Sequence, residues 1–489
     1  MTKEEKAKNK KVYAVLGGGR QGTAAAYDMA KWGEAEKVLI GDIDLKAAEK
    51  AAKRVNQLRG RKIAEGHQVD VTDHASLVAF LQGVDSFLSA VPYWHNPAIT
   101  RAAIEAKACM TDLGGNTDLV REQMKLSPQA QEAGIAIIPD CGQVPGMGTS
   151  LSVYAMSLLD ETDEIMMWDG GNPLQPQPPF NYILTFNIAG LTNEYYGVAH
   201  FIREGKRVEV PTFLSEDYET VEFPKPIGTM EAFVAGGGTS TMPWTFEGKL
   251  KTLWNKTLRW PGHFAEWQAY MKAGLLEAEP VDVNGVKVAP RDLLHTVLDP
   301  KIRAKKGEPD LVIVRVLAKG RKDGKPAEAL VELIDRYDEK HGFTAMERTT
   351  GWDGSLKAIL NAQGVTPRGV NPAELAVDGP RYAEELRKRG FDLTEQVTFV
   401  EQGKEEATKD TKDTKDKKKG KKGKKGKKDK QGKKDKQGKK DKEGKQEKKD
   451  KKEKKDKKGQ KDKKDKKGQK DKKDKKENEE QIEQKAETQ

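Results

Sequence analysis

Three glycines near the N-terminus have the spacing of a loop that binds a dinucleotide. Gly17, Gly19 and Gly22 form a G-x-G-x-x-G motif, and Asp42 follows the last glycine by 20 positions. Glycine at these positions permits a tight turn, a close approach of the backbone to a pyrophosphate, and close packing of a helix on a strand. A carboxylate at position 42 can accept hydrogen bonds from the ribose hydroxyls and would repel a 2′-phosphate. The motif therefore predicts NAD, in preference to NADP, as the cofactor.

Further residues are candidates for the same cofactor site because they lie in the glycine loop or near the ends of expected strands. They are Arg20, Gln21, Asp44, Asp70, Ala90 and Val91. Arg20 could touch the pyrophosphate or reach solvent. Asp44 could replace Asp42 or cap the helix that follows. The plainer alternative for the whole segment is a glycine-rich turn in a domain that binds no ligand.

Residues that can exchange protons follow three expected strands. Tyr93 and His95 follow the strand at 84–91, Asp112 ends the strand at 109–113, and the D-C-G-Q-V-P-G turn at 140–146 follows the next strand. Ligands bind at the carboxyl ends of parallel strands. We therefore expect these residues to lie near the nicotinamide, with Tyr93, His95 and Asp112 as catalytic candidates.

The elements that must position these residues alternate between strands and helices up to residue 145. This alternation of strands and helices predicts an α/β fold, a Rossmann doubly wound parallel sheet, over residues 1–145. Beyond Gly146, longer apolar runs come with hairpin signals such as Asn284-Gly285, which predict a second, α+β domain of mostly antiparallel strands over 146–350. We expect residues 351–400 to pack back on the first domain.

The last part of the chain has a different composition. Residues 401–489 contain 40 lysines and 23 acidic residues, a net charge of +17, whereas residues 1–400 carry −6. No apolar side chain occurs from Thr411 to Gln481, so this segment cannot bury enough apolar surface to offset its ordering entropy. We expect 401–489 to be a disordered, Lys-rich, low-complexity tail that makes at most weak contact with anionic surfaces.

From the sequence we expect no contact with a membrane, no disulfide framework and no metal site. No apolar run approaches the length of about 18 residues that a membrane span needs. The two cysteines, Cys109 and Cys141, are not part of a C-x-x-C pair, so we expect neither a disulfide framework nor a metal site. A cytoplasmic location, a small-molecule amine or amino-acid substrate and a homo-oligomer, a dimer first of all, are the expectations that remain.

Ordered motifs beyond the glycine loop resemble the saccharopine dehydrogenase superfamily. D-L-G-G at 112–115 and I-I-P-D-C-G-Q-V-P-G-M at 137–147 carry this similarity, which runs from about residue 11 to 395. The segments that look closest to the lysine 6-dehydrogenase branch lie at 170–180, 230–233, 236–241 and 256–263. The tail lies outside the similarity.

The resemblance implies a substrate held between the nicotinamide and the second domain. Tyr93, Asp112, the 142–146 turn and the segment Thr239, Ser240 and Thr241 would face it. It also implies hydride transfer at a C–N bond. Lysine 6-dehydrogenases oxidise the side-chain amine of L-lysine with NAD to an imine, which water converts to an aldehyde and ammonia.

This chemistry assigns roles to individual residues. A protonated amine cannot release hydride from its carbon, because the nitrogen must offer its lone pair, so a base must first remove a proton. Asp112 is the first candidate for the base and His95 the second; the alternative for Asp112 is a strand-end carboxylate that caps local backbone. Arg259 and Lys256 are available to bind a substrate carboxylate. The alternative for His95, Arg259 and His263 is a merely structural or exposed role.

Two rival functions remain open. An enzyme of the same fold could reduce an imine formed between an amine and a keto acid or aldehyde, as saccharopine and carboxynorspermidine dehydrogenases do. A non-catalytic NAD-binding protein is the other alternative. Formation of NADH from lysine alone separates lysine oxidation from imine reduction.

Overall fold

The computed structural model describes residues 10–400, so the predicted tail at 401–489 lies outside the described residues. Its first sheet has seven strands in the order β17-β6-β5-β4-β1-β2-β3. All of its neighbouring pairs are parallel. The strands are β1 (Lys11–Leu16), β2 (Ala35–Asp42), β3 (Ala64–Gln68), β4 (Ser86–Ser89), β5 (Cys109–Asp112), β6 (Ala136–Ile138) and β17 (Gly369–Val370). From β3 to β6 the order is that of a doubly wound dinucleotide-binding sheet, as predicted.

Helices connect these parallel strands. They are α2 (Arg20–Trp32), α3 (Leu45–Arg59), α4 (His74–Leu81), α5 (Asn96–Ala106), α6 (Thr117–Met124) and α7 (Ser127–Glu132), with a 3₁₀ turn, η1, at Tyr93–His95. Helix α2 packs closely because its buried face is made of small side chains, among them Ala24, Ala25 and Ala26, which are 0% exposed. The strand order reverses between β1 and β4, so the loops after these two strands diverge and leave a crevice for a ligand.

The second sheet has nine strands and is mostly antiparallel, as predicted. Its main path is β10-β11-β12-β7-β15-β16-β18, and β8 and β9 extend from β12. The strands are β7 (Glu161–Pro173), β8 (Val198–Arg203), β9 (Lys206–Pro211), β10 (Glu219–Phe223), β11 (Gly228–Phe233), β12 (Thr252–Arg259), β15 (Asp310–Lys322), β16 (Lys325–Arg336) and β18 (Leu393–Phe399). The pair β7 and β12 is parallel, and the cavity described below is built on it.

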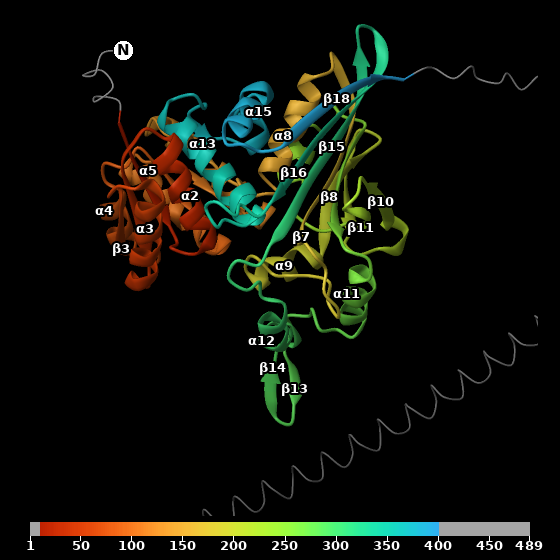
Figure 1. Ribbon diagram of the computed structural model, residues 1–489, viewed down its shortest axis with the longest axis horizontal. Coiled ribbons are helices and arrows are strands. Elements are labelled where there is room, and N and C mark those ends of the chain that lie inside the picture. The colour runs from red at the N-terminus through yellow and green to blue at the C-terminus, as the bar shows by residue number, and fades with distance from the viewer. Residues whose placement is uncertain (1–9, 401–489) are drawn as a thin grey trace, which may run out of the picture. The chain divides into compact units, whose positions relative to one another are not determined.

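The helices around this sheet are α8 (Met147–Ser157), α9 (Ile188–Tyr195), α10 (Met242–Thr245), α11 (His263–Lys272) and α12 (Pro290–Ile302). A short hairpin of β13 (Val281–Val283) and β14 (Val286–Val288) lies beside α12 (Figure 1). A further 3₁₀ turn, η2, covers Ser215–Asp217. Within residues 10–400, no helix is both long enough and apolar enough to cross a membrane.

The segment at 351–400 joins both sheets, whereas we predicted that it would pack on the first domain. Helix α13 (Asp353–Ala362) packs on α2, β4 and β5, and β17 pairs with β6. Helices α14 (Ala373–Ala376) and α15 (Gly379–Lys388) instead contact α8, and β18 pairs with β16. The pairing of β18 with the second sheet was not predicted, because the sequence of β18 alternates only weakly between polar and apolar residues. Its position is set by the open edge of β16.

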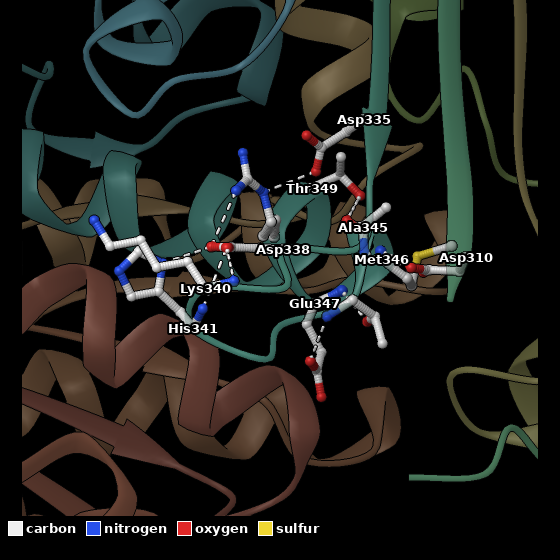
Figure 2. A network of polar contacts seen from close by, with 11 residues as sticks. Asp310, Asp335, Asp338, Lys340, His341, Ala345, Met346, Glu347 and Thr349 are labelled. Carbon is white, nitrogen blue, oxygen red and sulfur yellow. Dashed lines mark hydrogen bonds and ion pairs between the residues drawn. The ribbon is translucent and has the colours of Figure 1, made fainter. Parts of the chain in front are cut away.

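A network of polar contacts fixes the turn before η3, a π-helix at Glu347–Trp352 (Figure 2). The Asp310 carboxylate accepts hydrogen bonds from the N–H groups of Ala345 and Met346, at 2.6 and 2.9 Å. Arg348 donates to Asp335 at 2.9 Å and thereby ties η3 to β16. Turns of π-helix occur frequently at functional sites, and Met346 beside η3 lines the cavity between the two sheets.

Candidate active site

A cavity of about 630 Å³ lies between the carboxyl edge of the first sheet and one face of the second. The glycine loop and the loops after β4, β5 and β6 form one wall, and β7, α9 and β12 contribute to the other. A cofactor held at the first wall would therefore share the cavity with side chains of the second.

The geometry of the glycine loop fits a dinucleotide. A Cβ atom at Gly22 would lie 1.9 Å from the carbonyl oxygen of Gly17, and one at Gly17 would lie 2.8 Å from that of Ala90. Gly17 also has a φ of +102°, which favours glycine. Around Gly19, by contrast, the space is open, with nothing within 4 Å of its Cβ position. Helix α2 begins without a side-chain cap, so its first amides are available to a pyrophosphate.

The acidic candidates for the ribose differ in their contacts. The Asp42 carboxylate, at the end of β2, accepts hydrogen bonds from the N–H of Gly18 at 2.7 Å and of Asp44 at 2.9 Å. Asp44 is the N-cap of α3 and accepts from the N–H of Lys46 at 3.0 Å, which is the helix-capping role given above as the alternative. Asp70 is exposed and accepts hydrogen bonds from the N–H and the hydroxyl of Thr72, at 2.8 and 2.7 Å; like Asp42 it does not line the cavity, and its place in the cofactor site stays a prediction.

The other cofactor candidates line the cavity: Arg20, Gln21, Ala90 and Val91, together with Gly19 and Gly22. Arg20 donates from Nη2 to the carbonyl of Ala304 at 2.7 Å, which links the glycine loop to the second domain. Neither amide atom of Gln21 has a hydrogen-bond partner within residues 10–400. The Gln21 side chain is therefore free to contact a ligand.

Asp112 does not line the cavity, so the structure does not support it as the base. Its carboxylate is 0% exposed and accepts hydrogen bonds from the N–H of Gly114 (2.8 Å), the N–H of Asp140 (3.1 Å) and the amide of Gln123 (2.8 Å). Burial raises the pKa of Asp112 to about 6. Asp112 thus fits the alternative role given above, that of a strand-end carboxylate that caps local backbone. It holds the loops after β5 and β6 together.

Asp140 is the carboxylate that reaches the cavity from this sheet. It follows β6, and it accepts hydrogen bonds from the hydroxyl of Ser240 at 2.5 Å and the N–H of Gly115 at 3.3 Å. Asp140 and Ser240 both have positive φ values, +55° and +45°, a costly conformation that clusters at functional sites. Burial, with a smaller contribution from the charge of Asp112, raises the pKa of Asp140 to about 7.

The two catalytic candidates that follow β4, Tyr93 and His95, both lie on the η1 turn but differ in their position relative to the cavity. Tyr93 lines the cavity, together with its neighbour Trp94, which is 51% exposed. His95 is half-buried on the same turn and is not a lining residue. Tyr93 is thus placed at the cavity, whereas the role of His95 as the second candidate for the base stays a prediction.

The segment Thr239–Thr241 supports the site without lining it. Thr239 donates to the carbonyl of His200 at 2.8 Å, and Thr241 donates to Glu374 at 2.9 Å. Ser240 lies between them and is bonded to Asp140. The two threonines therefore anchor the segment, and we correct their expected role as substrate ligands.

One face of the second sheet carries polar side chains into the cavity. Thr257 and Arg259 on β12 and Asp169 on β7 line it, and Thr257 is paired with Asp169 across the two strands. Alternate residues of a strand point to the same face, so residues 257 and 259 project together.

Lys256 projects from the opposite face for the same reason, which makes it a wrong candidate for substrate binding. Its ammonium forms an ion pair with Glu219 at 3.2 Å and lies over the ring of Trp254. A lysine and an arginine three positions apart in one strand cannot both face a substrate.

The inner end of the cavity holds charged groups that are nearly inaccessible. Arg259 is 3% exposed; its Nε donates to the hydroxyl of Tyr195 at 2.7 Å, and its Nη1 donates to the carbonyl of Leu258 at 2.9 Å. Asp169 is 7% exposed. Burial raises the pKa of Asp169 to about 6 and that of Glu194 to about 8.

Asp140 was expected near the nicotinamide as part of the 140–146 turn but was not named as a candidate base, and Asp169 and Glu194 were not predicted. Asp140 stands in the quoted I-I-P-D-C-G motif and could have been found from its place after a strand. Asp169 and Glu194 have no local signal. No group of three or more His, Cys, Asp or Glu side chains in the described chain could hold a metal ion.

A dinucleotide loop and a buried carboxylate that open into one cavity define an NAD(P)-binding oxidoreductase. Comparison with family models is more specific. The saccharopine dehydrogenase NADP binding domain matches residues 13–138, and the saccharopine dehydrogenase C-terminal domain matches residues 142–391. The chain belongs to the saccharopine dehydrogenase family.

Known relatives are distant. Saccharopine dehydrogenase [NADP(+), L-glutamate-forming] of Saccharomyces cerevisiae is 23% identical over 276 residues, 54% of this chain and 60% of the yeast protein. Mitochondrial alpha-aminoadipic semialdehyde synthase of Rattus norvegicus is 24% identical over 215 residues, 42% of this chain and 22% of the rat protein. The chain thus spans less than two thirds of these relatives.

Solved structures share the fold. Apo saccharopine dehydrogenase (L-Glu forming) from Saccharomyces cerevisiae superposes with a TM-score of 0.64 and 18% identity, over 79% of this chain and all of that one. Homospermidine synthase from Legionella pneumophila, in complex with NAD, gives a TM-score of 0.55 and 13% identity, over 80% of this chain and 93% of that one.

Proposed function

We propose that this protein oxidises the side-chain amine of an amino acid, L-lysine first of all, with NAD. The observation that carries the proposal is Asp140, a buried carboxylate that lines the same cavity as the glycine loop. With a pKa of about 7, Asp140 can take up a proton near neutral pH. The bound nicotinamide would supply the hydride acceptor.

The residues of the chain have separate tasks in this reaction. Asp140 removes one proton from the substrate ammonium, so that the nitrogen lone pair can assist loss of hydride from the adjacent carbon. Ser240 orients the carboxylate through its 2.5 Å hydrogen bond. Water then converts the imine to an aldehyde and ammonia. The sum is substrate ammonium, oxidised cofactor and water giving aldehyde, ammonium ion, reduced cofactor and one proton.

Asp42 supports NAD over NADP in this proposal. Its carboxylate ends β2 beside the glycine loop, where the adenosine ribose lies in folds of this type. A 2′-phosphate would meet this negative charge. The matching family model and the yeast relative are both named for NADP, which makes the preference a point for direct measurement.

Imine reduction is the second candidate, because the yeast relative is named as a saccharopine dehydrogenase. NADH absorbance with L-lysine and NAD tests the first function, and Asp140→Asn serves as the matched inactive variant. Oxidation of NADH or NADPH by a mixture of an amino acid and an aldehyde, without turnover of lysine alone, would support the second function and refute the first.

A further inference from the structure

We propose that Glu374, on α14, is a positioning residue for Asp140: it anchors the segment that carries Ser240, and it places a buried negative charge behind the base. Glu374 belongs to the segment at 351–400 and does not line the cavity. It therefore acts on the reaction through other residues. The proposal rests on the proposed function, since it names a residue that acts on the base of that reaction.

The Glu374 carboxylate binds two hydroxyl groups close to Ser240. Thr241, the next residue in the chain, donates to both carboxylate oxygens, at 2.9 and 3.1 Å. Thr245, the last residue of α10, donates to Oε1 at 2.6 Å. Glu374 is only 2% exposed, and hydrogen bonds to a charged group are strong where water is excluded. Glu374 thus fixes the backbone that follows Ser240.

The backbone of Ser240 needs this anchor. Its φ of +45° lies in the left-handed region, and a side-chain-bearing residue stays there only where its surroundings hold it. Thr239 holds the preceding side through a hydrogen bond to a backbone carbonyl of β8 at 2.8 Å, and Thr241 holds the following side through Glu374. The Ser240 hydroxyl is thereby presented to the Asp140 carboxylate at 2.5 Å.

The charge of Glu374 also acts on Asp140. Both Glu374 oxygens accept hydrogen bonds from hydroxyl groups, which favours the ionised form, and no Lys, Arg or His of residues 10–400 pairs with it within 4.0 Å. Burial raises the pKa of Asp140 most, and the charges of Asp112, from β5, and of Glu374 raise it further. Burial raises the pKa of Glu374 itself, against the hydrogen bonds of its two threonines and the charge of Lys357 on α13.

A double-mutant cycle on the full chain, with kcat for L-lysine as the readout, tests the anchor. Ser240→Ala keeps the Cβ atom and removes the hydroxyl that orients Asp140, so kcat should fall about tenfold. Glu374→Ala should cause a similar fall and leave NADH affinity unchanged. Because Glu374 acts through Ser240, the double variant should be no slower than Ser240→Ala alone. Losses that multiply in the double variant would overturn the proposal.

Glu374→Gln tests the charge. The amide oxygen of glutamine can still accept hydrogen bonds from both threonines, so kcat should fall less than in Glu374→Ala. The lost negative charge should lower the pKa of Asp140 and move the acidic limb of the pH–rate profile to lower pH. A limb that does not move would overturn the proposal. If Glu374→Ala does not fold, Thr241→Val replaces it in the cycle, because it removes the hydroxyl that links Glu374 to this segment.

Glu231→Gln is the matched control for structural damage. Glu231 is also buried, and it accepts hydrogen bonds from the N–H groups of Gly262 and Phe264, at 2.8 and 2.9 Å, but it does not line the cavity. Glu231→Gln should lower the melting temperature without moving the limb. A shift of the limb as large as that in Glu374→Gln would mean that loss of any buried carboxylate suffices, and would contradict the specific role of Glu374.

The positioning role and the proposed function can fail separately. Carbon-13 NMR of the aspartate carboxyl groups gives the pKa of Asp140 without turnover, and Asp140→Asn assigns its signal. A lower pKa in Glu374→Gln, in a protein that oxidises no amine, would keep the action of Glu374 on Asp140 and refute the function. Lysine oxidation that responds to neither variant of Glu374 would keep the function and refute the positioning role.

Discussion

The two walls of the cavity recognise their ligands by different means. The first wall is a backbone site, in which glycine positions decide whether a pyrophosphate can approach. The second wall, with Asp140 at the edge between them, is a side-chain site in which buried carboxylates and one arginine line the cavity. Substitutions at the glycine positions should therefore act through shape, and substitutions of the charged side chains through charge.

The largest effect is expected where a side chain would collide with the loop itself. Gly22→Ala places a Cβ 1.9 Å from the carbonyl oxygen of Gly17, so the loop must shift and NADH affinity should fall about 100-fold or more, because a close-packed site cannot absorb the overlap. Gly19→Ala is the control for fold, since its Cβ meets nothing within 4 Å.

Fluorescence titration with NADH and thermal melting separate the two variants. Gly22→Ala should lower both NADH affinity and the melting temperature. Gly19→Ala should keep the melting temperature and weaken NADH alone, because its methyl group meets only the ligand. Unchanged NADH affinity in both variants would contradict the backbone site.

Asp42→Ala should have the next largest effect. Loss of charged hydrogen bonds to the ribose should weaken NAD by about 10-fold to 100-fold, and removal of the negative charge should raise the use of NADP. Steady-state kinetics with both cofactors check this. A preference that does not change would remove Asp42 from cofactor selection.

Asp112→Asn should change the acid–base behaviour more than the rate. The charge of Asp112 raises the pKa of Asp140, so its removal should lower that pKa and move the acidic limb of the pH–rate profile to lower pH. Turnover should fall less than about tenfold, since Asp112 does not touch the substrate. A loss of activity at every pH would restore Asp112 as the base.

The smallest effect is expected for Lys256→Met. Because Lys256 faces away from the cavity, KM for lysine should change less than about twofold, and loss of its partly exposed ion pair with Glu219 should cost about 1 kcal/mol or less. A large rise in KM would show that the faces of β12 are assigned wrongly.

The difference between the walls also explains what the sequence could predict. The strand order of the first sheet and the places of Gly17, Gly19 and Gly22 follow from local patterns, because a backbone site is encoded by contiguous residues. Strand alternation places Arg259 and Lys256 on opposite faces of β12, because they are three positions apart. The sequence alone could therefore have shown that only one of the two faces the cavity.

Asp169 and Glu194 could not be predicted in this way. Their role depends on where β7 and α9 meet the cavity, and residues far apart in the chain set that position. Asp112 and Asp140 lie at the ends of neighbouring strands and are both buried, and they differ in that only Asp140 lines the cavity. The site of a folded chain is thus harder to predict where side chains from distant segments build it.

The most direct test of the account is the pH dependence of kcat/KM for L-lysine with NAD, in the wild type and in Asp140→Asn. Only the ionised carboxylate can accept a proton, so wild-type activity should rise with pH through an apparent pKa near 7. Asp140→Asn should bind NADH normally, lose about 100-fold or more of the activity and lose this limb of the profile. An Asp140→Asn variant that keeps the limb and most of the activity would contradict the central claim.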